Sequence, residues 1–168
     1  MKHLTIVILS FTFISLLGCT PPKPNMDGFE HNTFACNVII ESPKATKHFL
    51  EFEGIVYDEI WIPNQDDICE LRSSLRKYLG EAPQVTTETW VNRDFLLSNI
   101  SKYKMEYSGF IRKGVRYIIC NMILYSGGEK GAAKEQFTII LDGGCGVVRV
   151  IFKASDKSVV RIDCNGVA

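Results

Sequence analysis

The residues of this 168-residue chain with the widest choice of chemistry are its six cysteines. A thiol can form a thioether with a lipid, a disulfide, a metal bond or a covalent catalytic intermediate. Cys19 ends an apolar N-terminal stretch, and Cys145 lies between glycines. The other four are dispersed, at Cys36, Cys69, Cys120 and Cys164. The surroundings of each cysteine therefore decide which chemistry it can perform.

The stretch that precedes Cys19 has the pattern of a signal peptide. Lys2 and His3 form a short basic start, and residues 4–17 carry no charge. As a helix these residues would span roughly 21 Å, less than the ~30 Å hydrocarbon core of a membrane, which disfavours a permanent transmembrane helix. The small Ala-x-Ala residues of an ordinary cleavage site are absent.

Leu16-Leu17-Gly18-Cys19 stands there instead and resembles the lipobox of exported bacterial lipoproteins. The resemblance implies cleavage between Gly18 and Cys19, diacylation of the Cys19 sulfur and acylation of the new amine. Two or more acyl chains attach a protein stably to a membrane. Thr20 occupies the position where a retention signal would carry Asp, which favours the outer membrane facing the periplasm. The alternative is an uncleaved hydrophobic N-terminus with an incidental cysteine.

The lipobox divides the chain into three parts. Residues 1–18 are the expected signal peptide. Residues 19–33 contain three early prolines, which fix φ and remove hydrogen-bond donors, so they are expected to form an extended tether that starts at the lipidated cysteine. Residues 34–168 then form a single globular domain. Removing 18 residues from 168 leaves 150, which is enough for one hydrophobic core.

Lipidation of Cys19 would leave five cysteines, an odd number for an oxidising compartment. Position along the predicted elements suggests two disulfides, Cys145–Cys164 and Cys36–Cys69, with Cys120 as a buried free thiol. Strict strand alternation argues against Cys145–Cys164, because it turns the two side chains to opposite faces. The glycines around Cys145 permit an irregular backbone that would remove this objection.

Catalytic and metal sites are not predicted. A thiol in Asp142-Gly143-Gly144-Cys145-Gly146 could act as a nucleophile beside a base, but the nearest candidates, His31 and His48, are distant in sequence. Paired Cys-x-x-Cys or His-x-x-x-His spacing is absent. We therefore expect no catalytic residue, no metal ligand and no cofactor.

The apolar pattern predicts the elements of the domain. Leucines and Ile68 at three- and four-residue steps predict a helix over residues 65–79, capped by Asn64 and followed by Gly80 as a stop. A shorter helix is predicted over residues 92–100. Strands are predicted over residues 38–40, 49–62, 102–112, 115–125, 137–141, 147–153 and 159–164.

Two strand registers follow from the requirement that apolar residues share a face. The turn Lys113-Gly114 pairs Arg112 with Val115. One face of this hairpin then carries Met105, Tyr107, Ile111, Ile118, Cys120 and Met122. The opposite face carries Phe110, Tyr117 and Ile119, and is either covered or a contact surface.

The last two strands are aligned in the same way. Their apolar residues pair Phe152 with Val160 and Val150 with Ile162, and this register places Arg149 opposite Asp163 as an outward charge pair.

The order of elements predicts an α+β fold, in which an antiparallel meander sheet packs on one main helix and one short helix. This architecture is similar to cystatin-like and nuclear-transport-factor-like folds. The domain also resembles a set of small secreted bacterial proteins of unknown function. The resemblance lies in Trp61-x-Pro63, Tyr107-x-Gly109, Asp142-Gly143-Gly144 and residues 165–168. It implies no activity.

The charge balance of 19 basic and 19 acidic residues gives no basic surface for nucleic acid, so nucleic-acid binding is not expected. The expected function is that of a lipid-anchored protein of the bacterial cell envelope, a non-enzymatic binding or structural module. Its expected partners are the membrane, through the lipid on Cys19, and an envelope protein. The alternative is a small-molecule-binding protein or enzyme that uses a concave pocket on the sheet.

Overall fold

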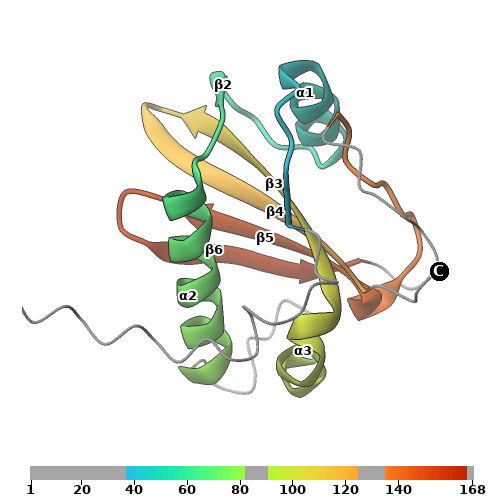
Figure 1. Cartoon of the computed structure of the whole chain (residues 1–168). Coiled ribbons are helices and arrows are strands. Elements are labelled where there is room, and N and C mark those ends of the chain that lie inside the picture. Colours follow the sequence, from blue (N-terminus) through green and yellow to red (C-terminus); the bar gives the residue numbers. More distant parts are fainter. Residues whose placement is uncertain (1–36, 82–90, 125–134, 166–168) are drawn as a thin grey trace, which may run out of the picture.

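The computed structural model of the chain describes residues 37–81, 91–124 and 135–165. These residues form a six-stranded sheet with helices, which confirms the predicted α+β class (Figure 1). The elements are β1 (Asn37–Ile39), α1 (Pro43–Phe52), β2 (Glu59–Trp61), α2 (Gln65–Glu81), α3 (Arg93–Asn99), β3 (Tyr103–Arg112), β4 (Val115–Leu124), β5 (Val147–Lys153) and β6 (Ser158–Cys164). Short 3₁₀ turns at Ile100–Lys102 and Gly144–Gly146 precede β3 and β5.

The β3–β4 hairpin forms with the predicted register, in which Arg112 pairs with Val115. Lys113 and Gly114 connect the strands, with φ angles of 52° and 72°. Two successive positive φ angles give the tight turn whose twist matches that of the flanking strands. The Lys113 N–H also donates to the Asp58 carboxylate. The turn therefore sets the register along the whole hairpin.

The strands follow the order β1-β3-β4-β5-β6, and β2 also pairs with β3. β3 to β6 form an antiparallel meander, as predicted. β1 is parallel to β3, whereas β2 is antiparallel to it further along the same strand. The segment between them, which contains α1, makes the reversal of direction. Four of the five strands predicted between residues 102 and 164 therefore form the meander, and β1 joins it in the parallel direction.

α2 covers one face of the sheet, as the leucine spacing predicts. Ile68, Leu71, Leu75 and Leu79 are buried against the inward residues of β3, β4, β5 and β6. Asn64 caps the helix reciprocally with Asp67: each side chain accepts a hydrogen bond of 2.9 Å from the other residue's backbone N–H. The helix continues through Gly80 to Glu81, so Gly80 is not its stop.

α1 covers the opposite face, and this helix corrects the prediction of a strand over residues 49–62. Ser42 caps α1 by accepting a hydrogen bond from the Ala45 N–H, and Pro43 occupies the first turn, where its missing donor costs nothing. Thr46, Phe49 and Leu50 are buried at helical spacing. Only Glu59–Trp61 of the predicted strand pairs with the sheet.

The second apolar face of the hairpin is core and not a contact surface. Phe110 and Ile119 are buried in a cluster with Phe49 and Leu50 of α1 and with Phe137. The rings of Phe49 and Phe137 stack with centroids 4.0 Å apart. The residues described by the structure therefore cover the sheet on both faces (Figure 1).

Two further predictions require correction. Residues 137–141 form an irregular segment and not a strand, although Phe137 is buried. A bulge between Ile151 and Phe152 shifts the register of β5 and β6, so that Phe152 pairs with Val159 and not with Val160. Beyond the bulge the predicted pairs Val150–Ile162 and Arg149–Asp163 are confirmed.

Substitution by alanine should change the free energy of unfolding in opposite directions at Gly109 and at Gly80. A Cβ at Gly109 would lie 2.5 Å from the Trp61 ring, whose position is held by hydrogen bonds to the carbonyl groups of Phe110 and Tyr117. Gly109→Ala should lower the free energy of unfolding by about 1–3 kcal/mol through overpacking. A Cβ at Gly80 meets no atom within 4 Å, so Gly80→Ala should raise it by about 0.5–1 kcal/mol. Urea unfolding measures both, and equal effects would contradict this packing.

Candidate functional site

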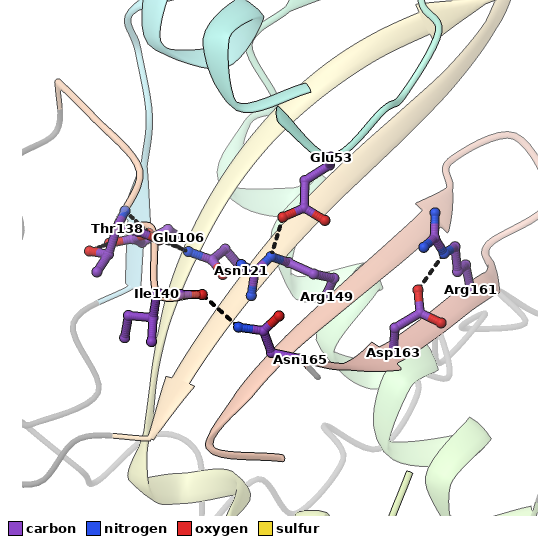
Figure 2. A network of polar contacts seen from close by, with 9 residues as sticks. All are labelled: Glu53, Glu106, Asn121, Thr138, Ile140, Arg149, Arg161, Asp163 and Asn165. Atoms are coloured by element: carbon purple, nitrogen blue, oxygen red, sulfur yellow. Dashed lines mark hydrogen bonds and ion pairs between the residues drawn. The ribbon is translucent and has the colours of Figure 1, made fainter. Parts of the chain in front are cut away.

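A row of polar residues crosses the sheet on the face that α1 covers. Glu106, Asn121, Arg149 and Asp163 are successive cross-strand partners on β3, β4, β5 and β6, and we call these four residues the polar row. Glu106, Asn121 and Arg149 are buried, at 1%, 0% and 6% exposure. Figure 2 shows these side chains between the sheet, the end of α1 and the segment that carries Thr138 and Ile140.

Glu106 is held by four contacts. Its Oε2 accepts hydrogen bonds from Asn121 Nδ2 and the Thr138 N–H, both at 2.8 Å. Its Oε1 accepts from Thr138 Oγ1 at 2.6 Å and forms an ion pair with Lys104 Nζ at 2.9 Å. Both carboxylate oxygens are therefore already engaged by two contacts each, which leaves Glu106 poorly placed to take a proton from a substrate. Glu106 therefore attaches the irregular segment at Thr138 to the sheet.

Arg149 connects the sheet to α1. Its Nε donates to Oε1 of Glu53, at the end of α1, over 2.8 Å. Its guanidinium also lies over the Phe49 ring, 5.5 Å from the centroid. The register with Asp163 is as predicted, but Arg149 is buried and bonds to Glu53, while Asp163 bonds to Arg161. The expected outward ion pair between Arg149 and Asp163 is therefore wrong.

Two atoms of the polar row have no hydrogen-bond partner among the described residues. These atoms are Asn121 Oδ1, an acceptor, and Arg149 Nη1, a donor, and both are buried. Asn121 Nδ2 already donates to Glu106 and to the Thr138 carbonyl, so exchanging the amide atoms would not satisfy the group. Because Asn121 and Arg149 are cross-strand partners, the unused acceptor and the unused donor belong to neighbouring residues of the row.

Cys145 and Cys164 form a disulfide, with Cα atoms 4.6 Å apart. The objection from strand alternation does not apply, because Cys145 lies in the 3₁₀ turn Gly144–Gly146 and not in β5. Gly144 has φ 48°, a conformation that glycine adopts without strain. The Tyr103 hydroxyl donates to the Cys145 carbonyl, and burial raises the pKa of Tyr103 to about 12, so this donor stays protonated at alkaline pH as well as near neutrality.

The two remaining cysteines in the described part of the chain, Cys120 and Cys69, are not disulfide-bonded. Cys120 is buried and free, as predicted, and burial raises the pKa of its thiol well above the ordinary range. Cys69 is exposed and free on α2. Cys36, the partner expected for Cys69, lies outside the described residues, as do Gly18 and Cys19. His48 is exposed on α1, and His31 lies outside the described part.

The motif residues have structural roles. The Trp61 indole lies against Gly109, its partner on β3, so Trp61-x-Pro63 and Tyr107-x-Gly109 meet in space. The Asn165 side chain donates to the Ile140 carbonyl beside the polar row (Figure 2). No group of three or more histidine, cysteine or carboxylate side chains among the described residues is placed to hold a metal ion. In the same part of the chain, no helix is both long and apolar enough to cross a membrane.

Comparisons of the chain with protein-family models, with curated proteins and with solved structures find no match.

Of the polar row, only the pairing of Arg149 with Asp163 is predicted, although the sequence contains a signal for Glu106 and Asn121 as well. Glu106 and Asn121 each interrupt an apolar strand, and the hairpin register places them opposite each other. Their contacts with Thr138 and the position of Glu53 depend on α1 and on the irregular segment, which the sequence pattern did not reveal.

Because the Glu106 carboxylate makes four contacts, even a small substitution there should lower the stability of the fold markedly. Glu106→Gln removes the charge that Lys104 pairs with and places an amide donor against one of the donors that the carboxylate accepts from. The free energy of unfolding should fall by about 2–3 kcal/mol. The matched control Glu59→Gln, at an exposed position of β2, should change it by less than about 0.5 kcal/mol. Equal unfolding curves for the two variants would show that the carboxylate contacts do not stabilise the fold.

Proposed function

We propose that this chain is a lipid-anchored protein of the bacterial cell envelope, attached to the outer membrane through Cys19 and facing the periplasm. The observation that carries the proposal is the Cys145–Cys164 disulfide in a chain that begins with a signal-like stretch ending in Leu16-Leu17-Gly18-Cys19. Disulfides persist in exported proteins and are rare in the cytosol. The disulfide and the lipobox are independent features, and both agree with export.

The globular domain acts as a non-enzymatic binding or structural module that contacts another envelope protein. The saturated Glu106 carboxylate, the buried Cys120 thiol and the bridged Cys145 leave no nucleophile–base pair among these groups. Among the described residues, both faces of the sheet are covered by side chains of the domain itself. The domain therefore offers a partner its edges, helices and loops.

Replacing Cys19 tests the anchor. Cys19→Ser keeps the size of the side chain but removes the sulfur that would carry the lipid. In a bacterial host fed labelled palmitate, the wild-type chain should incorporate label and sediment with membranes. Cys19→Ser should lose the label and keep residues 1–18. Mass spectrometry of the purified chain measures both.

Two controls separate the anchor from folding and export. Cys69→Ser removes an exposed thiol and should leave labelling unchanged. The Cys145–Cys164 bridge should be oxidised in the exported chain, which free-thiol alkylation detects. Undiminished palmitate incorporation by Cys19→Ser, with a normal processed mass, would disprove the lipoprotein assignment.

The polar row favours a second candidate, the binding of a small polar molecule. Asn121 Oδ1 and Arg149 Nη1 together present one acceptor and one donor to a molecule that carries both functions, such as a primary amide. The contacts of Glu53, Phe49 and Asn121 around Arg149 would orient such a molecule. This candidate places the site under α1 and not in an open concave pocket of the sheet.

Thermal unfolding in the presence of acetamide, a small primary amide, tests this candidate. A compound that binds only the folded protein raises the midpoint temperature of unfolding once its concentration exceeds its Kd. The second candidate requires a rise with acetamide in the wild type that Arg149→Met abolishes and the exposed-site control Arg161→Met retains. The absence of any rise, or a rise that Arg149→Met leaves unchanged, would remove it.

A further inference from the structure

β6 is the last strand of the sheet and pairs with β5 on one side only within the described residues. Val160 is 51% exposed, and the Arg161 side chain is 52% exposed. A strand at the edge of a sheet presents unpaired backbone N–H and C=O groups that another strand can bind. The opposite edge differs, because β1 and β2 each contribute three residues along β3.

The hydrogen bonding of β5 and β6 shows which backbone groups of β6 are not bonded to β5, among them those of Ile162, which is 5% exposed with its side chain in the core. The Asn165 N–H donates to the Val147 carbonyl at 2.8 Å, so this pair is of the hydrogen-bonded kind. In an antiparallel ladder the two kinds of pair alternate, which directs the backbone groups of Asp163 and Arg161 toward β5. The N–H and C=O of Ile162 and Cys164 therefore point away from the sheet.

The edge strand β6 carries one positive and one negative side chain, so two copies of it can place opposite charges against each other. Arg161 and Asp163 lie on either side of Ile162 and form an ion pair with each other within the strand. A two-fold axis through Ile162 would place Arg161 of one copy opposite Asp163 of a second copy, and the reverse. The same axis pairs Ile162 with itself, so that the two outward-pointing backbone groups of each copy bond to those of the other. Backbone geometry and charge therefore select the same register.

From this agreement we propose that β6 is a self-association surface, where two copies of the chain join their sheets through antiparallel pairing centred on Ile162. The partner is a second copy of this chain. The bulge at Ile151/Phe152 ends the regular part of β6 beside Val160, so the shared ladder is short. The opposite-charge contacts then carry much of the affinity and select this register over those that place like charges together.

Charge reversal provides the test, with the full chain kept in non-ionic detergent so that any attached lipid stays in solution. Two copies with different affinity tags are produced together, and the fraction of one that is captured with the other is measured. Arg161→Glu in both copies places two carboxylates opposite each other, and Asp163→Lys in both copies places two cations opposite each other. Each change should reduce capture about tenfold or more.

A combination of the two variants, one in each copy, distinguishes a loss of pairing from a loss of folding. One copy with Arg161→Glu and the other with Asp163→Lys restores opposite charges in this register, and capture should return to near the wild-type level. Lys47→Glu and Glu51→Lys make the same changes to an exposed ion pair on α1 and should leave capture unchanged. Absent wild-type capture, or a mixed pair no better than either single variant, would overturn the proposal.

Discussion

The pairing of β3 with β4 is the constraint on which the rest of the structure depends. The turn at Lys113-Gly114 fixes Arg112 against Val115, and every later pair along the hairpin follows from that one. β1 and β2 attach to one side of this hairpin, and β5 attaches to the other. A slip of one residue would turn the apolar face under α2 toward α1 and would separate Glu106 from Asn121.

The strand register places the residues of the polar row, which are far apart in sequence, next to one another. Glu106, Asn121 and Arg149 each lie in an apolar strand, where a single polar group would be costly to bury. Asn121 donates to Glu106, Glu106 also accepts from Thr138 and pairs with Lys104, and Arg149 bonds to Glu53. The network holds both coverings of this face, α1 and the segment around Thr138, so its first effect is on the stability and specificity of the fold.

The parts of the fold that sequence reasoning predicted are those in which local patterns agree with tertiary packing. α2 combines leucine spacing with a cap at Asn64, and the hairpin combines alternation with a turn. The sequence pattern does not predict α1 because its few apolar residues, such as Phe49 and Leu50, also fit a strand, although Ser42-Pro43 marks a helix start. Partners distant in sequence have no local signal, so Glu53 could not be placed beside Arg149, nor the shift to Val159 foreseen.

The strands of the meander and the helices that cover them differ in how far apart in sequence their contacts lie. β3 and β4 pair across a two-residue turn, and the strands that follow add to neighbours already formed. α1, by contrast, is tied to the sheet by Thr46 to Ser108, 62 residues apart, and by Glu53 to Arg149, 96 residues apart. Loops of this length close slowly because the lost chain entropy is recovered only at the final contact. α2 likewise reaches the end of the meander over a long separation, since Lys157 bonds to Glu70 across 87 residues. The pairing of successive strands from β3 to β6 therefore needs the shortest closures, and docking of the two helices completes the domain.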